Sequence, residues 1–268
     1  MHRQEWTGKR VWITGASSGI GEALARAFWA KGCQLILSAR RASELQRVAD
    51  SLPPSPAQRC FCLPMDVAET DRAVEHAKAV EDAFGGVDLL VHCAGVSQRS
   101  WTVETPLDLD RKIMEINYFG TIALTKAVLP MQLRAGGGTI VVLSSISGKF
   151  GFYLRSAYSA SKHALHGFFE SLRMETYKQG MRVMMVCPGK IRTDISLHAL
   201  GADGKPRGSM DAALAAGRDP GDLADAIIRG LEKGTEELYF GGKEMKAIWV
   251  RQYFPRLFSR LIRKQKPE

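Results

Sequence analysis

The stretch RVWITGASSGIG, residues 10–21, joins a short apolar run to a loop that contains three glycines. We predict a buried strand over residues 10–14 and a helix directly after the loop. Glycines at such a turn let the backbone approach a pyrophosphate, whose charge is held by amides at the helix N-terminus. A tight turn that needs positive φ is the alternative explanation. The position of the loop directly after a first strand favours nucleotide binding.

The rest of the chain continues this alternation of strand and helix. The predicted strands cover residues 10–14, 34–38, 59–63, 87–92, 139–144, 182–187 and 237–240. The predicted helices cover residues 21–31, 43–51, 69–84, 107–134, 157–179 and 222–233. Such alternation is typical of right-handed βαβ units. It predicts an α/β fold, a doubly wound parallel sheet of Rossmann type with about seven strands and with helices on both faces.

Length and composition limit the classes of protein to consider. The chain has 268 residues, of which 45% are hydrophobic and 24% charged, so it can build the core of one α/β domain and is not disordered throughout. It contains no apolar run near the ~18 residues that a spanning helix needs. The polar N-terminus leads into a strand, so no secretory signal is predicted there. The formal net charge of +9 comes without a nucleic-acid recognition motif, so no nucleic-acid partner is predicted.

Two segments interrupt the alternation. Residues 190–218 are rich in Gly, Ala and single charges and are too long for an ordinary connection. Residues 243–268 hold eight Lys and Arg against two Glu, and therefore carry +6 of the formal charge of +9. We predict one nucleotide-binding and catalytic domain over residues 1–242, followed by a basic amphipathic extension.

Five cysteines, an odd number, are scattered along the chain: Cys33, Cys60, Cys62, Cys93 and Cys187. None belongs to a Cys-x-x-Cys pair, and no histidine lies at a spacing typical of zinc ligands. All of them fall in or beside predicted strands. We interpret them as buried free thiols of a cytoplasmic protein, because the cytoplasm is a reducing compartment, and we predict no metal site.

The end of the second predicted strand bears on the choice of cofactor. A site for NAD has a carboxylate about 20 residues past the glycine loop, where it binds the ribose 2′-hydroxyl. This chain has Ala39 there, followed by Arg40 and Arg41. Because arginine pairs with a phosphate through its planar fork, the sequence favours NADP(H) over NAD(H). Two solvated arginines that open a helix are the alternative, which stays open for Arg41.

Tyr158 and Lys162 lie four residues apart on a predicted helix and therefore share one face. Such a pair is weak alone, and a second one, Tyr239 with Lys243, straddles two glycines and cannot form a helical face. Ser145, however, follows the C-terminal end of a predicted strand, and ligands of parallel sheets bind at these ends of the strands. An ammonium about 4 Å from a phenol contributes about 4 kcal/mol at an effective dielectric constant of about 20. We expect this charge to lower the pKa of Tyr158 and to suit it for general acid–base catalysis.

These motifs follow one another in the order typical of the short-chain dehydrogenase/reductase family, which the chain resembles from its first strand to about Phe240. Residues 14–21 match the family's Thr-Gly-x-x-x-Gly-x-Gly loop. The remaining matches are Asp66-Val67 at its adenine contact, Asn117 at its helix asparagine, Ser145 at its serine, Tyr158 with Lys162 at its Tyr-x-x-x-Lys pair, and Pro188-Gly189 with Thr193 at its nicotinamide segment.

The resemblance implies an NADP(H)-dependent oxidoreductase that interconverts a carbonyl and a secondary alcohol. Tyr158 would exchange a proton with the substrate, Lys162 would lower its pKa and hold the nicotinamide ribose, and Ser145 would hydrogen-bond the substrate oxygen. Asn117 would anchor a water that connects Lys162 to solvent. The predicted cofactor-binding residues are Gly15, Ser17, Ser18, Gly19, Ile20, Gly21, Arg40, Asp66, Val67, Ala94, Gly95, Tyr158, Lys162, Pro188, Gly189 and Thr193.

Two departures from the family pattern concern the cofactor. The family usually has Asn-Asn-Ala-Gly after its fourth strand, whereas this chain has His92-Cys93-Ala94-Gly95. We expect Cys93 to loosen cofactor binding without affecting the chemistry. Ser18 is neutral where members that prefer NADP often carry a basic residue, so this preference rests mainly on Arg40.

A non-catalytic NADP(H)-binding redox sensor or a membrane-associated scaffold is the alternative function. The intact set Asn117, Ser145, Tyr158 and Lys162 argues against it, since a pure binder needs no such set. The histidines nearby, His163, His166 and His198, are interpreted as satisfied or solvated side chains rather than proton shuttles.

The substrate is predicted to be hydrophobic, such as a lipid or steroid. Residues 150–154, FGFYL, supply large apolar surface just before Tyr158. Segment 190–218 would cover the substrate, and its glycines Gly201, Gly204 and Gly208 give it freedom to close. Core packing is an equal alternative for the aromatic residues.

The basic extension is predicted to contain an amphipathic helix that begins at Pro255. Leu257, Phe258, Leu261 and Ile262 form its apolar stripe, and three arginines fall on the opposite side. Three placements stay open, because this helix can lie on an anionic membrane, cover the substrate mouth or pack on a partner subunit. The chain resembles the hydroxysteroid-dehydrogenase-like branch, whose members are often membrane-associated, and the family resemblance also implies a homo-oligomer.

Overall fold

The computed structural model of the protein describes residues 5–264, in which seven strands form one parallel sheet. The strands are β1 (Arg10–Thr14), β2 (Gln34–Ala39), β3 (Cys60–Pro64), β4 (Leu89–His92), β5 (Gly138–Leu143), β6 (Met181–Pro188) and β7 (Glu237–Phe240). Their order across the sheet is β3-β2-β1-β4-β5-β6-β7. The order runs outward in both directions from β1 and β4, which confirms the predicted doubly wound parallel sheet.

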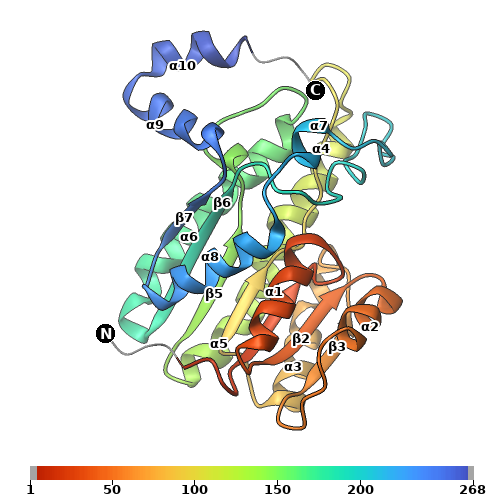
Figure 1. Cartoon of the computed structure of the whole chain (residues 1–268), viewed down its shortest axis with the longest axis vertical. Coiled ribbons are helices and arrows are strands. Elements are labelled where there is room, and N and C mark those ends of the chain that lie inside the picture. Colours follow the sequence, from red (N-terminus) through yellow and green to blue (C-terminus); the bar gives the residue numbers. More distant parts are fainter. Residues whose placement is uncertain (1–4, 265–268) are drawn as a thin grey trace.

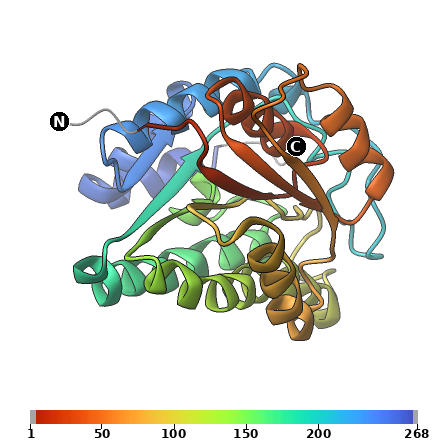
Figure 2. The ribbon, with the colours of Figure 1, turned by 90° about the horizontal axis from the view of Figure 1, so that it is seen from below.

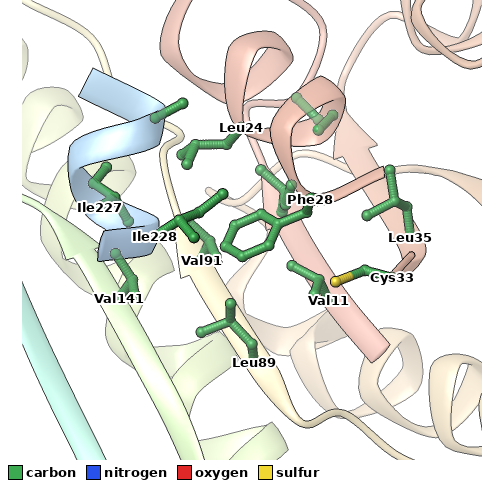
Figure 3. Close-up of a cluster of buried hydrophobic side chains, with 14 of the residues drawn as sticks. Val11, Leu24, Phe28, Cys33, Leu35, Leu89, Val91, Val141, Ile227 and Ile228 are labelled. Atoms are coloured by element: carbon green, nitrogen blue, oxygen red, sulfur yellow. The ribbon is translucent and has the colours of Figure 1, made fainter. Parts of the chain in front are cut away.

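Helices cover both faces of the sheet (Figures 1 and 2). The helices of one face are α1 (Gly19–Ala30), α2 (Ala42–Asp50) and α8 (Pro220–Glu232). Those of the other face are α3 (Ala73–Phe84), α5 (Gly120–Arg134) and α6 (Ser156–Thr176). Figure 3 shows the first of these layers, where Leu24 and Phe28 of α1 meet Ile227 and Ile228 of α8 above the strands.

The central strand β1 shows why the strands are continuous apolar runs. Val11 and Ile13 point into the core on one face of the sheet, and Trp12 points into the core on the other, with all three side chains fully buried. A sheet that is covered on both faces has no solvent side and therefore no polar alternation. The indole of Trp12 donates a hydrogen bond to the Ser38 hydroxyl of β2, at 2.9 Å, so its buried N–H is satisfied.

The predicted helix over residues 107–134 is three elements. It begins as α4 (Leu107–Met114), continues through a π-helical turn (Glu115–Phe119) and ends as α5. The turn contains Asn117, and a π-turn inserts one extra residue that a hydrophobic period does not reveal. The predicted helices over 69–84 and 157–179 likewise include 3₁₀ turns, Thr70–Arg72 and Tyr177–Gln179.

The five cysteines are all free thiols, but only two of them are buried. Cys33 and Cys187 lie in the interior, whereas Cys60, Cys62 and Cys93 are partly exposed, so the prediction of burial was wrong for these three. Cys60 and Cys62 lie on β3, the edge strand of the sheet, where one neighbour is missing.

The segment between β6 and α8 and the basic extension both lie at the C-terminal ends of the strands (Figure 1). Segment 190–218 is closed at its base by pairing of Ile191 with Arg218, and it contains the short helix α7 (Ala212–Ala215). The extension forms α9 (Lys246–Tyr253) and α10 (Pro255–Ile262), as predicted for the helix that begins at Pro255. Among residues 5–264, no helix combines the length and the apolar character that crossing a membrane would require.

Candidate active site

The glycine loop between β1 and α1 is closed so tightly that side chains do not fit at its glycines. A Cβ atom on Gly15, whose φ is +66°, would lie 2.8 Å from the amide nitrogen of Ala94. A Cβ atom on Gly21 would lie 2.2 Å from the carbonyl oxygen of Gly15, and φ at Gly19 is +56°. The loop therefore presents bare backbone at the N-terminus of α1, which fits the pyrophosphate of a dinucleotide.

The Thr14 hydroxyl connects this loop to the end of β4. It donates a hydrogen bond to the carbonyl of Val91, at 3.4 Å, and accepts bonds from the amides of Cys93 and Ala94, both at 3.2 Å. Thr14 thus holds the loop after β4 against the glycine loop. Its place at the end of the first strand was the sequence signal for this role, which we did not predict.

Arg47 of α2 supports the glycine loop from the other side. It donates a hydrogen bond to the carbonyl of Ser17, at 3.0 Å, and pairs with Glu22 of α1, at 2.9 Å. The hydrogen bond from Arg47 is the main reason why the pKa of Glu22 lies below its ordinary value. A single arginine in a helix belongs to no motif, so the sequence carried no signal for this residue.

A groove runs from the glycine loop across the ends of the first strands. Of the predicted cofactor-binding residues, those that line it are Gly15, Ser17, Ser18, Gly19, Ile20, Gly21, Arg40, Asp66, Val67, Ala94, Gly95 and Thr193. Arg40 is exposed within the groove, and Ala39 beside it offers no carboxylate. Arg41 lines the groove, as a cofactor-binding residue would, and it is also the N-cap residue of α2, as the alternative of an arginine that opens a helix requires.

The groove continues into a second cavity that holds the predicted catalytic groups. Ser145, Tyr158, Lys162, Pro188 and Gly189 line this catalytic pocket. The residues that line both cavities are Ile20, Cys93, Gly95, Thr193 and Ile195. The structure therefore brings together every predicted site residue except Asn117, which lies beneath the pocket.

Tyr158 lies in the first turn of α6 and is almost fully buried. Burial raises the pKa of its phenol, because the charged phenolate loses solvation. A hydrogen bond with Ser145 and the positive charges of Arg155 and Arg99 act in the opposite direction but do not outweigh burial.

The ammonium of Lys162 is bound by a backbone carbonyl. Its Nζ donates a hydrogen bond to the carbonyl of Leu143, at 2.7 Å, and lies 5.8 Å from the centre of the Tyr158 ring. Burial lowers the pKa of Lys162 to about 8. The expected lowering of the Tyr158 pKa by Lys162 is therefore wrong for this structure, because desolvation dominates both groups.

Ser145 follows β5 and opens a tight 3₁₀ turn, Ile146–Gly148. Its hydroxyl accepts a hydrogen bond from the amide of Ser147, at 3.1 Å, which orients it at the pocket. Gly148 is required for this turn, because a Cβ there would lie 2.4 Å from the hydroxyl of Ser144.

Asn117 binds the loop after β4 with its whole side chain. Its Oδ1 accepts a hydrogen bond from the amide of Val96, at 2.8 Å, and its Nδ2 donates to the Val96 carbonyl and the Ser161 hydroxyl, at 3.0 and 2.9 Å. A Cβ on Gly95 would lie 3.1 Å from Asn117 Oδ1 and 3.7 Å from Lys162 Nζ. Asn117 thus fixes the wall beside Lys162.

The three histidines near the site differ in their surroundings. Nε2 of His166 lies 3.0 Å from the Ser144 hydroxyl, and burial lowers the pKa of His166 to about 4. Nδ1 of His163 lies 2.7 Å from the carbonyl of Ser159, while His198 lines the groove. His166 is buried and hydrogen-bonded, in agreement with its interpretation as a satisfied side chain rather than a proton shuttle.

His166 also belongs to a cluster with metal-ligand chemistry. Its ring nitrogen, Cys187 Sγ and a Glu237 oxygen lie within 4.8 Å of one another. The Lys149 ammonium pairs with Glu237 and lies 3.3 Å from His166 Nδ1, so a protein cation already neutralises the carboxylate.

The wall of the catalytic pocket combines apolar and charged side chains. The apolar ones are Ile146, Phe152, Tyr153, Ile191, Ile195, Leu214 and Ile262, and the charged ones besides Lys162 are Arg99, Arg155, Lys190, Asp211 and Glu244. Arg99 and Asp211 form an ion pair that is nearly inaccessible to solvent. Of the predicted aromatic surface, Phe150 is core and Phe152 and Tyr153 face the pocket.

The extension packs over the mouth of this pocket with its inner face. The rings of Phe258 and Phe150 lie 4.9 Å apart, Ile262 lines the pocket, and the Tyr153 hydroxyl donates to the carbonyl of Arg263, at 3.4 Å. The outer face leaves five large apolar side chains exposed, namely Trp249, Tyr253, Phe254, Leu257 and Leu261. The extension therefore covers the substrate mouth, and contact with a membrane or with a partner subunit would use its outer face.

Comparisons with known proteins agree with this geometry. The family described as short chain dehydrogenase matches residues 9–200. A relative from Anopheles gambiae, the dehydrogenase/reductase SDR family protein 7-like, is 40% identical over 263 residues, which cover 96% of this chain and 83% of the relative.

Two solved structures match nearly the whole chain. A short chain dehydrogenase from Burkholderia cenocepacia, in complex with NADP, has a TM-score of 0.79 at 25% identity and covers 97% of this chain and 99% of its own. A short chain dehydrogenase/reductase from Burkholderia phymatum, in complex with NAD, shares the fold with a TM-score of 0.83 at 22% identity, over 98% of both chains. The chain therefore belongs to the short-chain dehydrogenase/reductase family, whose members are nucleotide-binding oxidoreductases with a Rossmann-type fold.

Proposed function

We propose that the protein is an NADP(H)-dependent oxidoreductase that interconverts a carbonyl and a secondary alcohol on a hydrophobic substrate. The observation that carries this proposal is the meeting of Ser145, Tyr158 and Lys162 in one pocket that continues into the groove of the glycine loop. The nicotinamide cofactor, when bound, supplies or accepts the hydride.

The chain's own residues would divide the remaining work. Ser145 donates a hydrogen bond to the substrate oxygen, and Tyr158 exchanges the proton with that oxygen as general acid and base. Lys162, which lines the same pocket, binds the nicotinamide ribose. Asn117 keeps the wall beside Lys162 in place and anchors a water that connects this lysine to solvent.

The proposed preference for NADP(H) rests on Arg40. This arginine is exposed in the groove, where its planar guanidinium suits a 2′-phosphate, and no carboxylate stands at position 39 to bind a free 2′-hydroxyl. The solved relatives include complexes with NADP and with NAD, so the choice depends on this chain's own residues.

The proposed substrate is a lipid-like or steroid-like molecule that reaches the pocket beside the extension. The apolar wall contributed by Phe152, Tyr153 and Ile262 supports this class, since the charged pair Arg99 and Asp211 neutralise each other. We further propose that the outer face of α9 and α10 rests on an anionic membrane, because exposed aromatic residues lie there among arginines. By the family resemblance, the protein would assemble as a homo-oligomer.

A panel of ketones and aldehydes, from small to steroid-sized, tests the proposed function. Oxidation of NADPH and of NADH is followed by absorbance, while cofactor binding is measured separately by fluorescence. We expect hydrophobic carbonyls to be reduced, and NADPH to be used in preference. Tight binding of NADPH without turnover of any member of the panel would contradict the proposal and favour a redox sensor.

A further inference from the structure

The helix that carries Tyr158 and Lys162 receives the cap of its N-terminus from a distant loop. Its own N-cap residue is Arg155, whose guanidinium is only a donor and lies 3.4 Å from Asp211. The first turn is closed by a hydrogen bond from the amide of Ser159 to the carbonyl of Arg155, at 2.8 Å. The amides before Ser159 need acceptors from outside the helix.

Gln98, from the loop between β4 and α4, supplies an acceptor for two of these amides. Its Oε1 accepts hydrogen bonds from the amides of Ala157 and Tyr158, at 2.9 and 3.3 Å. Its Nε2 lies within hydrogen-bond distance of three hydroxyls, those of Ser100, Thr105 and Ser156. The side chain is completely buried and is held at both ends. Gln98 thus does what the side chain of a serine or aspartate does at an ordinary N-cap.

Residues 97–100, which we call the clamp, also hold the chain just before α6. The amide of Ser100 donates a hydrogen bond to the carbonyl of Leu154, at 3.2 Å. The φ angle of Leu154 is +62°, a left-handed conformation that a leucine adopts rarely and only where its surroundings enforce it. The clamp therefore fixes the backbone just before α6 and within its first turn.

The clamp is joined in turn to the segment that covers the substrate. The amide of Arg99 donates to the carbonyl of Leu200, and the amide of Leu200 donates to the carbonyl of Ser97, both at 2.9 Å. The side chain of Arg99 forms its buried ion pair with Asp211, which lies in the same segment. The clamp thus binds both the covering segment and the start of α6, and it fixes their positions relative to each other.

We propose that Gln98 is a positioning residue for Tyr158, which it holds in register with the covering segment by capping the first turn of α6. The inference rests on the proposed role of Tyr158 as general acid and base. Gln98 lines neither the groove nor the catalytic pocket, so its loss would act on turnover more than on binding of the cofactor. Small displacements matter here, since a misplacement of about 1 Å can cost about a hundredfold in rate.

Two substitutions distinguish the effect of the hydrogen-bond acceptor of Gln98 from the effect of its side-chain volume. Gln98→Met keeps the volume but removes the acceptor for the amides of Ala157 and Tyr158. Gln98→Glu keeps this acceptor, and the three hydroxyls around it can donate to the carboxylate. Each variant is compared with wild type for thermal unfolding, kcat, the KM for NADPH and the pH profile of turnover. The pKa of Tyr158 is also measured in each variant from the absorbance of tyrosinate as a function of pH. Subtracting the titration of the same variant with the additional change Tyr158→Phe isolates the signal of Tyr158, and this measurement needs no turnover.

We expect Gln98→Met to lower kcat by roughly tenfold to a hundredfold, with the KM for NADPH changed less than about twofold. We expect Gln98→Glu to recover most of kcat and to raise the pKa of Tyr158, because a negative charge near the phenol disfavours the phenolate. A folded Gln98→Met protein with wild-type kcat and pH profile would overturn the proposal. Should that variant fail to fold, a folded Gln98→Glu protein that does not recover kcat would overturn it instead, because this variant keeps the acceptor. Absence of Tyr158-dependent turnover in wild type contradicts the proposed function, whereas a shifted tyrosinate titration in Gln98→Met still shows that Gln98 positions the phenol.

Discussion

Burial and positive charge act in opposite directions on the phenol of Tyr158. Desolvation raises its pKa, whereas Ser145, Arg155 and Arg99 favour the phenolate. Burial also lowers the pKa of Lys162 to about 8, so this lysine holds its charge less firmly than an exposed one. A carbonyl reductase needs the neutral phenol, which can donate its proton, and the surroundings of Tyr158 favour that form.

Replacement of Arg40 tests the choice of cofactor at a single residue. We expect Arg40→Asp to raise the KM for NADPH by roughly tenfold to a hundredfold, because a charge-assisted contact with the phosphate becomes a repulsion. The KM for NADH should fall or stay the same. Arg41→Asp is the matched comparison, since it makes the same change of charge at the neighbouring position of the groove, which is also the N-cap of α2, where aspartate is well tolerated; its effect on the KM for NADPH should be the smaller one. Identical kinetics of wild type and Arg40→Asp with both cofactors would refute the assignment.

His92 should make the protein sensitive to acid. It is buried beside Thr125, at 2.8 Å, and burial lowers its pKa to about 3 from an ordinary value of 6.5. Between pH 6.5 and 4, His92 is protonated in the unfolded chain but stays neutral in the folded protein, so the free energy of unfolding falls as the pH falls through this range. We expect His92 to contribute about 3 kcal/mol to this loss. Urea unfolding at pH 7 and pH 4 should therefore show a smaller loss for His92→Gln, and an equal loss in both proteins would speak against this account.

The regular elements are where sequence analysis succeeded. The predicted strands 10–14 and 237–240 have the observed bounds. Burial on both faces makes β1 a continuous apolar run, and the apolar periods located the long helices. The pair Tyr158 and Lys162 could be predicted because two residues four positions apart on one helix necessarily share a face. The pocket that unites them with the glycine loop follows from the topology of a parallel sheet.

What the sequence concealed depends on contacts between distant segments. The π-turn at Asn117 adds one residue to a helix without altering its composition, and Gln98 is an isolated polar residue in a loop. The direction of the Tyr158 pKa shift also escaped prediction, because a charge spacing is visible in a sequence while the degree of desolvation is not. Each of these features requires the packed structure.

Gly120 tests the close packing where the π-turn meets α5. A Cβ atom there would lie 2.3 Å from the carbonyl oxygen of Val67, at the predicted adenine contact. We expect Gly120→Ala to lower the free energy of unfolding by about 2 kcal/mol and to weaken NADPH binding, since the backbone at Val67 must move. Gly167→Ala, at an exposed position of α6, is the control, and because nothing lies within 4 Å of its added Cβ, it should stabilise by up to about 1 kcal/mol. Equal effects of the two changes in chemical denaturation would show that the contact is unimportant.

The outer face of α9 and α10 is tested by sedimentation with lipid vesicles. Trp249, Phe254 and Leu257 are about half exposed or more. Their replacement by Ser should reduce binding to vesicles of phosphatidylglycerol and phosphatidylcholine by at least about tenfold, through lost insertion of apolar surface, with folding unchanged. The matched control replaces Val74, Met174 and Tyr177, which are at least as exposed but belong to α3, to the C-terminal end of α6 and to the turn after it. If both triple variants bind as wild type does, the membrane proposal is wrong.

At the scale of the whole molecule, the chemistry is gathered at one end of the sheet. The glycine loop, Ser145 and Pro188 all lie at the C-terminal ends of strands, and the extension lies over the same end (Figure 1). The formal charge of +9 is concentrated there too, since residues 243–264 carry +6 of it. Most of the net positive charge therefore lies beside the pocket, in the extension that packs over its mouth.

The central claim is that this end of the sheet is an active site in which Tyr158 transfers the proton. The most direct measurement compares wild type and Tyr158→Phe in the reduction of a hydrophobic ketone at saturating NADPH, with cofactor affinity measured in both. We predict that kcat falls by about a hundredfold or more, as the loss of a general acid implies, while the affinity for NADPH changes little. A Tyr158→Phe protein that binds NADPH and retains the wild-type kcat would contradict the account.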